Sequence, residues 1–172
     1  MSPFNAETFG KEKAAAAHSQ FVHRLILVLA TWGGVGFLPI APGTWGTAAA
    51  LPLWWLLTHL GFPGYLLALA ALLVVSLIVA GPAQDLLGRK DHPAIVIDEV
   101  AGLLTALAGV PLSWTWAFAG FLAFRAFDIL KPWPISRLNR GTSGLAVVAD
   151  DLAAGVLARV VVALLMMIGG GG

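Results

Sequence analysis

A long stretch without any charged residue, from Leu60 to Gln84, constrains this chain more than any other feature. Crossing the hydrocarbon core of a bilayer takes about 20 apolar residues in a helix, so we predict a membrane-spanning helix that includes Tyr65–Ala80. The composition agrees, because 59% of the 172 residues are hydrophobic and 11% are charged, whereas soluble domains carry about 25% charge. The chain is therefore predicted to be an integral membrane protein.

The pattern of apolar runs and breaks predicts an all-α fold, a polytopic membrane bundle of about four to six helices. A polar N-terminal segment (1–20), with a short interfacial helix, is expected to precede one membrane domain (21–168) and a glycine tail (169–172). Phe21–Leu38 contains several glycines, which weaken a helix, so a re-entrant or surface helix is expected there. The remaining helices are expected at Trp45–Leu60, Ile95–Gly109, Trp114–Leu130 and Leu145–Ile168.

The basic residues predict the orientation of these helices. The loops at 85–92 and 131–144 hold Arg89, Lys90, Lys131, Arg137 and Arg140, five of the ten basic residues, and the turns at 61–64 and 110–113 hold none. Because cytoplasmic loops are enriched in Lys and Arg, the basic loops are predicted to be cytoplasmic. A net charge of +1 gives no reason to expect nucleic acid as a partner, and the absence of cysteine excludes disulfides and thiolate metal sites.

Five of the nine acidic residues lie within apolar helices, and the topology places all five at one membrane boundary. Buried carboxylates that repel one another are tolerated when a divalent cation neutralises them, and an all-oxygen set suits Mg²⁺ or Mn²⁺. The alternative is that acids near helix starts only complement the helix dipole. We expect metal ligands and catalytic groups among Asp98, Glu99, Asp128, Asp150 and Asp151.

Two cations accompany these acids. Arg125 and Asp128 are three residues apart and share a helix face, while Pro132 is expected to stop the helix just after Lys131. Arg125 offers a planar fork for phosphate oxygens and Lys131 a point charge. The alternative for both is snorkelling to lipid headgroups.

Two further features offer weaker signals. Gly43 and Thr44 lie in a Pro-Gly-Thr loop, where backbone N–H groups at a helix start could bind phosphate. Thr44 is expected to cap that helix. The alternative is a purely structural turn. His92, just before the acidic helix, is either a general acid or base or an ordinary surface histidine.

Four motifs together resemble the phosphatidylglycerophosphatase A family. They are Leu38–Thr47 (LPIAPGTWGT), Ile95–Gly102 (IVIDEVAG), Phe124–Ile135 (FRAFDILKPWPI) and Asp150–Gly155 (DDLAAG), in the family's order and spacing. The family usually has a histidine and a glycine-rich run before the aspartate pair. This chain reads Thr142–Ala146 (TSGLA) there, so no role of that histidine is carried over.

The resemblance implies a Mg²⁺-dependent phosphatase of the bacterial inner membrane, multi-pass, with its active site facing the cytoplasm. Its substrate would be an anionic phospholipid, phosphatidylglycerophosphate, and its product phosphatidylglycerol. Direct attack by water and an aspartyl-phosphate intermediate both stay open. The rival functions are an ion-coupled transporter, since intramembrane acids also mark ion paths, and a non-enzymatic membrane scaffold.

Overall fold

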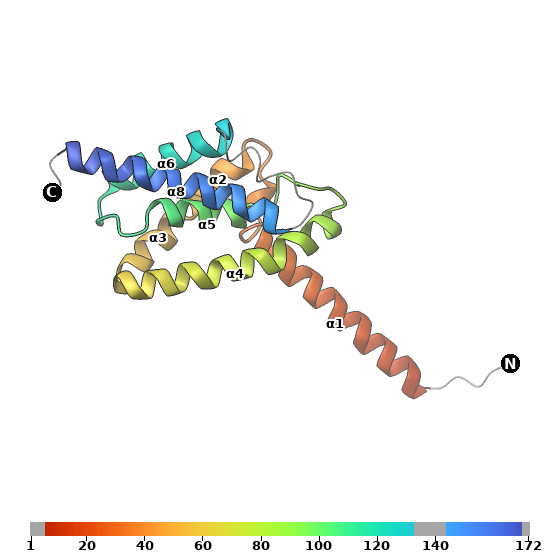
Figure 1. Cartoon of the computed structure of the whole chain (residues 1–172). Coiled ribbons are helices and arrows are strands. Elements are labelled where there is room, and N and C mark those ends of the chain that lie inside the picture. Colours follow the sequence, from red (N-terminus) through yellow and green to blue (C-terminus); the bar gives the residue numbers. More distant parts are fainter. Residues whose placement is uncertain (1–5, 133–143, 170–172) are drawn as a thin grey trace.

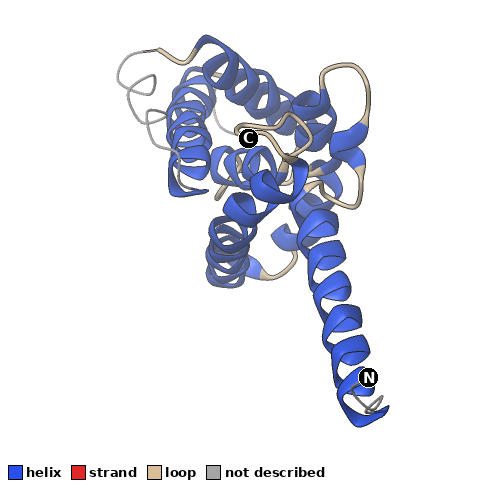
Figure 2. Cartoon of the chain, turned by 90° about the vertical axis from the view of Figure 1, so that its right-hand side faces the viewer, coloured by secondary structure: helices blue, strands red, loops and turns tan. Residues whose placement is uncertain are grey.

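Helices form all the regular secondary structure of the described residues, 6–132 and 144–169, in this computed structural model (Figures 1 and 2). The predicted all-α class is confirmed for these ranges. Two helices are long and apolar enough to cross a bilayer: α4 (Gly61–Leu87) and the Val148–Ile168 part of α8 (Gly144–Ile168). The first of these contains the predicted span Tyr65–Ala80. The motif residues Trp133–Ile135, the loop cations Arg137 and Arg140, and Thr142 and Ser143 lie outside the described residues.

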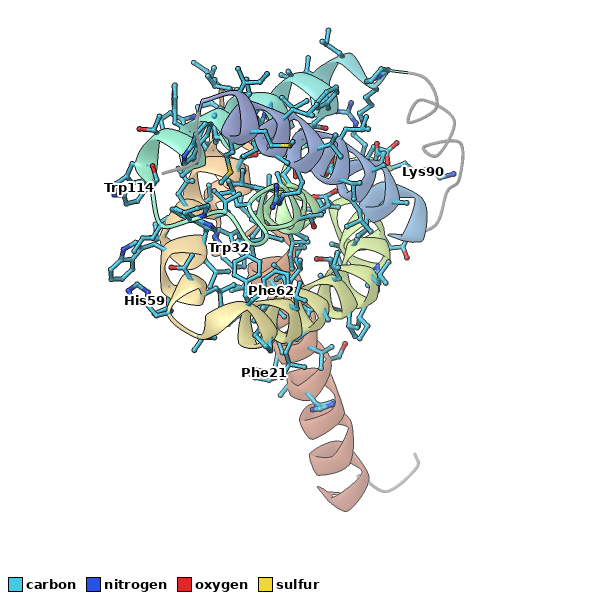
Figure 3. All side chains as sticks on the ribbon, turned by 60° about the vertical axis from the view of Figure 1, so that its left-hand side comes forward. Phe21, Trp32, His59, Phe62, Lys90 and Trp114 are labelled. Carbon is cyan, nitrogen blue, oxygen red and sulfur yellow. The ribbon has the colours of Figure 1, made fainter. Side chains whose placement is uncertain are left out.

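The N-terminal part of the chain differs from the prediction. A single helix, α1 (Ala6–Ala30), replaces the expected short interfacial helix and broken segment, and it projects away from the other helices (Figures 1 and 2). The chain breaks only where Trp32, Gly33 and Gly34 take positive φ values, before a 3₁₀ turn, η1 (Val35–Phe37). The glycines therefore end the helix at one point instead of weakening the whole segment. Phe21 on α1 is 65% exposed (Figure 3).

The helix expected at Trp45–Leu60 is two helices, α2 (Pro42–Ala49) and α3 (Leu51–Thr58). Pro52, which lacks an N–H and whose ring clashes with the carbonyl four residues earlier, explains the break near Ala50. The prediction that Thr44 caps α2 is wrong, because Ala41 occupies the capping position and Thr44 is the third helical residue. Pro42 suits the first helical position, where no N–H is needed.

The centre of the bundle is α5 (Ile97–Ala106), which packs against α2, α4, α8 and α6 (Trp114–Leu130). It runs parallel to α8, while α4 and α6 run the opposite way (Figure 1). With ten residues α5 is about 15 Å long, half the hydrocarbon thickness of about 30 Å. Its side chains Leu103 and Leu104 are fully buried.

This arrangement brings four helix ends together. The ends of α4 and α6 and the starts of α5 and α8 lie at one end of the bundle (Figure 1). Lys90, just beyond α4, lies on the opposite side of the molecule from His59 and Trp114 (Figure 3). The acidic segments predicted to share one depth are therefore at the same end as Lys90.

Candidate active site

Three carboxylates meet where α5 and α8 begin. Asp98 and Glu99 lie in the first turn of α5, and Asp151 lies in the second turn of α8. One oxygen from each of the three lies within 4.8 Å of the others. Asp98 and Asp151 are each 5% exposed. Such a buried concentration of negative charge is costly unless a cation neutralises it.

The three carboxylates open into a cavity of about 170 Å³. Its walls include all six predicted catalytic residues and the predicted phosphate-binding Lys131, so these residues lie together, while their catalytic and binding roles stay predictions. Asp128 and Asp150 lie in the wall but outside the group of three. The lining residues are Asp91, His92, Pro93, Ile95, Asp98, Glu99, Asp128, Lys131, Asp150 and Asp151.

Each of the two cations near the cavity is held by one carboxylate. Nη1 of Arg125 donates to Oδ2 of Asp128 at 2.5 Å, on one face of α6 as the spacing predicted. Nζ of Lys131 donates to Oδ2 of Asp150 on α8. Partial burial opposes the charge of Lys131, but Asp150, Asp151 and Asp128 outweigh it and hold the pKa of Lys131 above its ordinary value. Lys131 is therefore a positive charge in the cavity wall.

Two buried polar atoms beside the cavity have no hydrogen-bond partner among the described residues. They are Oε2 of Glu99 and Nε of Arg125. Burial without a partner costs free energy, and charged groups cost the most. A cation beside Glu99 and an anion beside Arg125 would satisfy both atoms. The site thus has the chemistry of a place for a metal ion and an anionic ligand.

The start of α2 closes one side of this arrangement. A Cβ placed on Gly43 would collide with Oε1 of Glu99 and lie 3.2 Å from Nη1 of Arg125. The backbone of α2 therefore sits directly against the acid and the cation. Thr44 is half-buried and does not line the cavity, so its phosphate contact stays a prediction.

The loop before α5 supplies the last wall. Nδ1 of His92 accepts the N–H of Ala94 at 3.1 Å, so a neutral His92 ring carries its proton on Nε2. The N–H of Asp91 is held by Oε1 of Gln84 at 3.0 Å. The sequence analysis assigned no site role to Asp91, Pro93 or Ile95, which also line the cavity. Their nearness to His92 in the chain was the signal that could have identified them.

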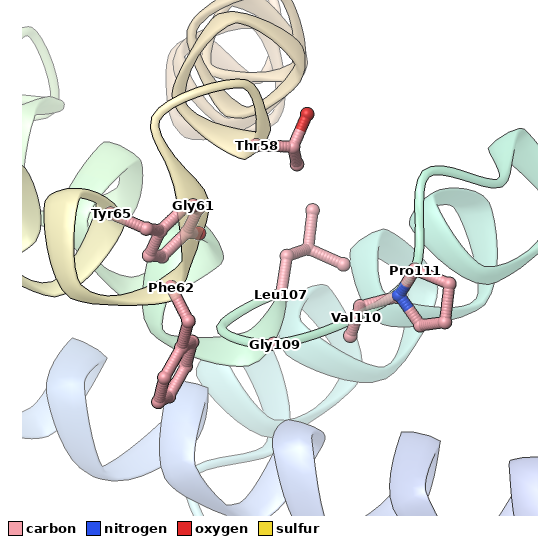
Figure 4. Close-up of a pocket in the computed structure, with 8 residues that line it drawn as sticks. All are labelled: Thr58, Gly61, Phe62, Tyr65, Leu107, Gly109, Val110 and Pro111. Carbon is pink, nitrogen blue, oxygen red and sulfur yellow. The ribbon is translucent and has the colours of Figure 1, made fainter.

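A second cavity, of about 210 Å³, lies towards the far end of α5 (Figure 4). Thr58, Phe62, Leu107 and Val110 are among its lining residues, and no charged side chain lines it. The hydroxyl of Tyr65 is engaged, because it donates to the carbonyl oxygen of Leu104 at 2.5 Å. This cavity offers no group for acid–base or metal chemistry, so the acidic cavity is the candidate active site.

The model of the family described as phosphatidylglycerophosphatase A matches residues 28–166. The chain belongs to this family. A protein named phosphatidylglycerophosphatase A from Escherichia coli (strain K12) is 37% identical over 132 residues, which cover 76% of this chain and 77% of the relative. The protein of the same name from Haemophilus influenzae is 38% identical over 140 residues, 80% of this chain and 86% of the relative.

A third protein similar to this chain carries a different name. It is a Bacteroides thetaiotaomicron protein, provisionally named as a phosphatidylinositol-3-phosphatase, 34% identical over 147 residues, 81% of this chain and 92% of the relative. Both names describe phosphatases. No solved structure matches the chain.

Proposed function

We propose that this chain removes the terminal phosphate from phosphatidylglycerophosphate, giving phosphatidylglycerol, at the cytoplasmic face of a bacterial inner membrane. Membership of the phosphatidylglycerophosphatase A family supports the substrate and the reaction. The placement of Lys90 and Lys131 at the same end as the acidic cavity supports the orientation, because cytoplasmic loops are enriched in basic residues.

One observation carries the proposed chemistry. Asp98, Glu99 and Asp151 form a carboxylate cluster in which Oε2 of Glu99 is buried and unpartnered. These oxygen ligands fit Mg²⁺, which prefers carboxylates and accompanies phosphate substrates. When bound, Mg²⁺ would supply a Lewis acid for the phosphoryl oxygens and lower the pKa of an attacking water.

The remaining residues have roles that follow from their contacts. Arg125 is oriented by Asp128, and its Nε has no partner among the described residues, so it is suited to bind non-bridging oxygens of the terminal phosphate. Lys131, oriented by Asp150, adds positive charge in the cavity wall. His92 lines the cavity and its neutral ring keeps Nε2–H, so it is suited to donate a hydrogen bond to the departing glycerol oxygen, which takes up its proton from the attacking water as the phosphorus–oxygen bond breaks. Water supplies the new oxygen of the released inorganic phosphate.

The test is phosphate release by the purified protein in detergent micelles. We expect release from phosphatidylglycerophosphate with Mg²⁺, and its loss with EDTA. Phosphatidylinositol 3-phosphate is the comparison substrate, because one relative carries that name. Faster release from the inositol lipid would overturn the proposed substrate assignment. Full activity with EDTA would overturn the proposed metal requirement.

A further inference from the structure

The last helix carries a charge that the proposed chemistry does not use. Arg159 lies on α8, two turns beyond Asp151 and within the apolar span Val148–Ile168. The ion pairs of the described residues that lie near the cavity involve Arg125 and Lys131. Arg159 instead donates its Nε–H to the carbonyl oxygen of Ala108 at 2.6 Å. A cation in an apolar helix is costly, so this contact requires an explanation.

The carbonyl that Arg159 binds lies just past the end of α5. Ala108 follows the C-cap Leu107, so its carbonyl lies near the negative end of the α5 dipole. A guanidinium there makes a charge-assisted hydrogen bond and offsets the dipole. Arg159 therefore fastens the end of α5 to α8.

The opposite end of α5 carries the acids. Asp98 lies in the first turn of α5, ten residues before Ala108, and Asp151 precedes Arg159 by eight residues on α8. The two parallel helices thus meet at two places, roughly 12–15 Å apart at 1.5 Å per residue. One meeting place is the carboxylate cluster and the other is the Arg159–Ala108 bond.

Between these places the two backbones are in close contact. A Cβ on Gly155 of α8 would collide with the carbonyl oxygen of Gly102 and lie 3.0 Å from Cβ of Thr105. A Cβ on Gly102 would lie 2.9 Å from the carbonyl oxygen of Asp151. The glycines let the two backbones approach closely and so set the distance between the helices, while the Arg159–Ala108 bond adds a fixed point along them.

We propose that Arg159 is a positioning residue that fixes the register of α5 against α8. By holding Ala108, it sets how far Asp98 and Glu99 reach towards Asp151 at the other end. Its role is remote from the substrate. The inference concerns the geometry of the two helices and rests on the proposed function only where metal binding is the readout.

The test compares the wild type with Arg159→Ala, Arg159→Lys and Val160→Ala. Val160 is the matched control, because it is the next residue on α8 and is 51% exposed. The first readout is Mn²⁺ binding by the substrate-free protein in detergent, followed from the electron paramagnetic resonance signal of free Mn²⁺. Loss of a partner that touches a metal ligand costs about 10–100-fold in affinity, and Arg159 acts from further away, so Arg159→Ala should bind Mn²⁺ severalfold more weakly.

The second readout follows the turn after α5 relative to α8, a separation that changes with the register. The chain has no cysteine, so cysteines introduced at the exposed positions Leu112 and Leu164 are the only sites for nitroxide labels. The distance distribution between the labels should broaden or shift in Arg159→Ala and stay as in the wild type in Val160→Ala. Arg159→Lys keeps a charged donor and should recover part of both losses.

The outcomes separate this inference from the proposed function. An unchanged distance distribution and wild-type Mn²⁺ affinity in Arg159→Ala would overturn it, even if the melting temperature fell. Equal effects of Arg159→Lys and Arg159→Ala would also contradict it. If the wild type bound no Mn²⁺, the proposed metal site would fail, and the distance measurement alone would decide the register.

Discussion

Nη1 of Arg125 lies 2.5 Å from Oδ2 of Asp128, three residues further along α6. This ion pair engages the carboxylate of Asp128 and fixes the position of the Arg125 guanidinium. Nε of Arg125 stays buried without a partner among the described residues. Asp128 thus orients a cation and is not part of the closest carboxylate group. Asp128 therefore has a different position from the clustered acids, although the sequence predicts one role for all five.

Replacing Arg125 should weaken transition-state stabilisation more than substrate binding. Arg125→Ala is expected to lower kcat about 10²-fold, as for other donors to developing phosphoryl or oxyanion charge. Arg125→Lys keeps the charge but loses the fork, so it should recover only part of that loss. Steady-state kinetics on phosphatidylglycerophosphate would measure both. A wild-type kcat in Arg125→Ala would contradict a phosphate-binding role.

Glu99→Gln should remove a metal ligand while keeping the shape of the side chain. We expect at least a tenfold rise in the Mg²⁺ concentration for half-maximal activity, about the effect of losing a group that supports a metal. Asp85→Asn is the matched control, since Asp85 is an exposed acid outside the cavity. A Mg²⁺ titration of phosphate release distinguishes them. The metal assignment fails if both variants respond to Mg²⁺ as the wild type does.

The neighbours Asp150 and Asp151 should behave differently. Asp151 belongs to the carboxylate cluster, so Asp151→Asn should weaken Mn²⁺ binding. Asp150 binds Lys131, so Asp150→Asn should chiefly release that lysine and raise KM for the anionic lipid. Mn²⁺ binding and steady-state kinetics on both variants check this. Equal loss of Mn²⁺ binding in the two would show that Asp150 is also a ligand.

Gly43→Ala should disturb the site through one added methyl group. The new Cβ would press on Oε1 of Glu99, so Mn²⁺ binding and activity should both fall severalfold. Gly46→Ala is the control on the same helix, because its Cβ would meet the side chain of Val96 and no carboxylate within 3.2 Å. Its expected effect is a lower melting temperature with wild-type Mn²⁺ affinity. Unaltered Mn²⁺ binding in Gly43→Ala would contradict this prediction, because it would show that α2 shifts to accommodate the methyl group and leaves Glu99 in place.

The convergence of the site could be predicted because it depends on local spacing and on chain direction. Three-residue spacing placed Arg125 and Asp128 on one face, and loop charges placed the acidic segments at one end. The bounds of α6 were also predictable, since apolar residues fill Trp114–Leu130 up to Arg125 and Pro132 follows closely.

Other features depend on how the helices pack and left no signal in the pattern. The contact of Gly43 with Glu99 and the bond from Arg159 to Ala108 join residues that are far apart in the chain. The course of α1 was mispredicted because the glycines were taken to weaken all of Phe21–Leu38. The structure confines their effect to the positive-φ turn at Trp32–Gly34.

The position of α5 has a consequence for how this chain tolerates variation. None of the ten residues of Ile97–Ala106 is exposed: eight are buried, and Glu99 and Thr105 are half-buried. In α4, by contrast, exposed residues such as Leu67, Val74 and Ile78 alternate with buried ones. A library of single substitutions should therefore show a periodic stripe of tolerance along α4. Along α5 it should show none, so this short central helix would be the segment least free to change.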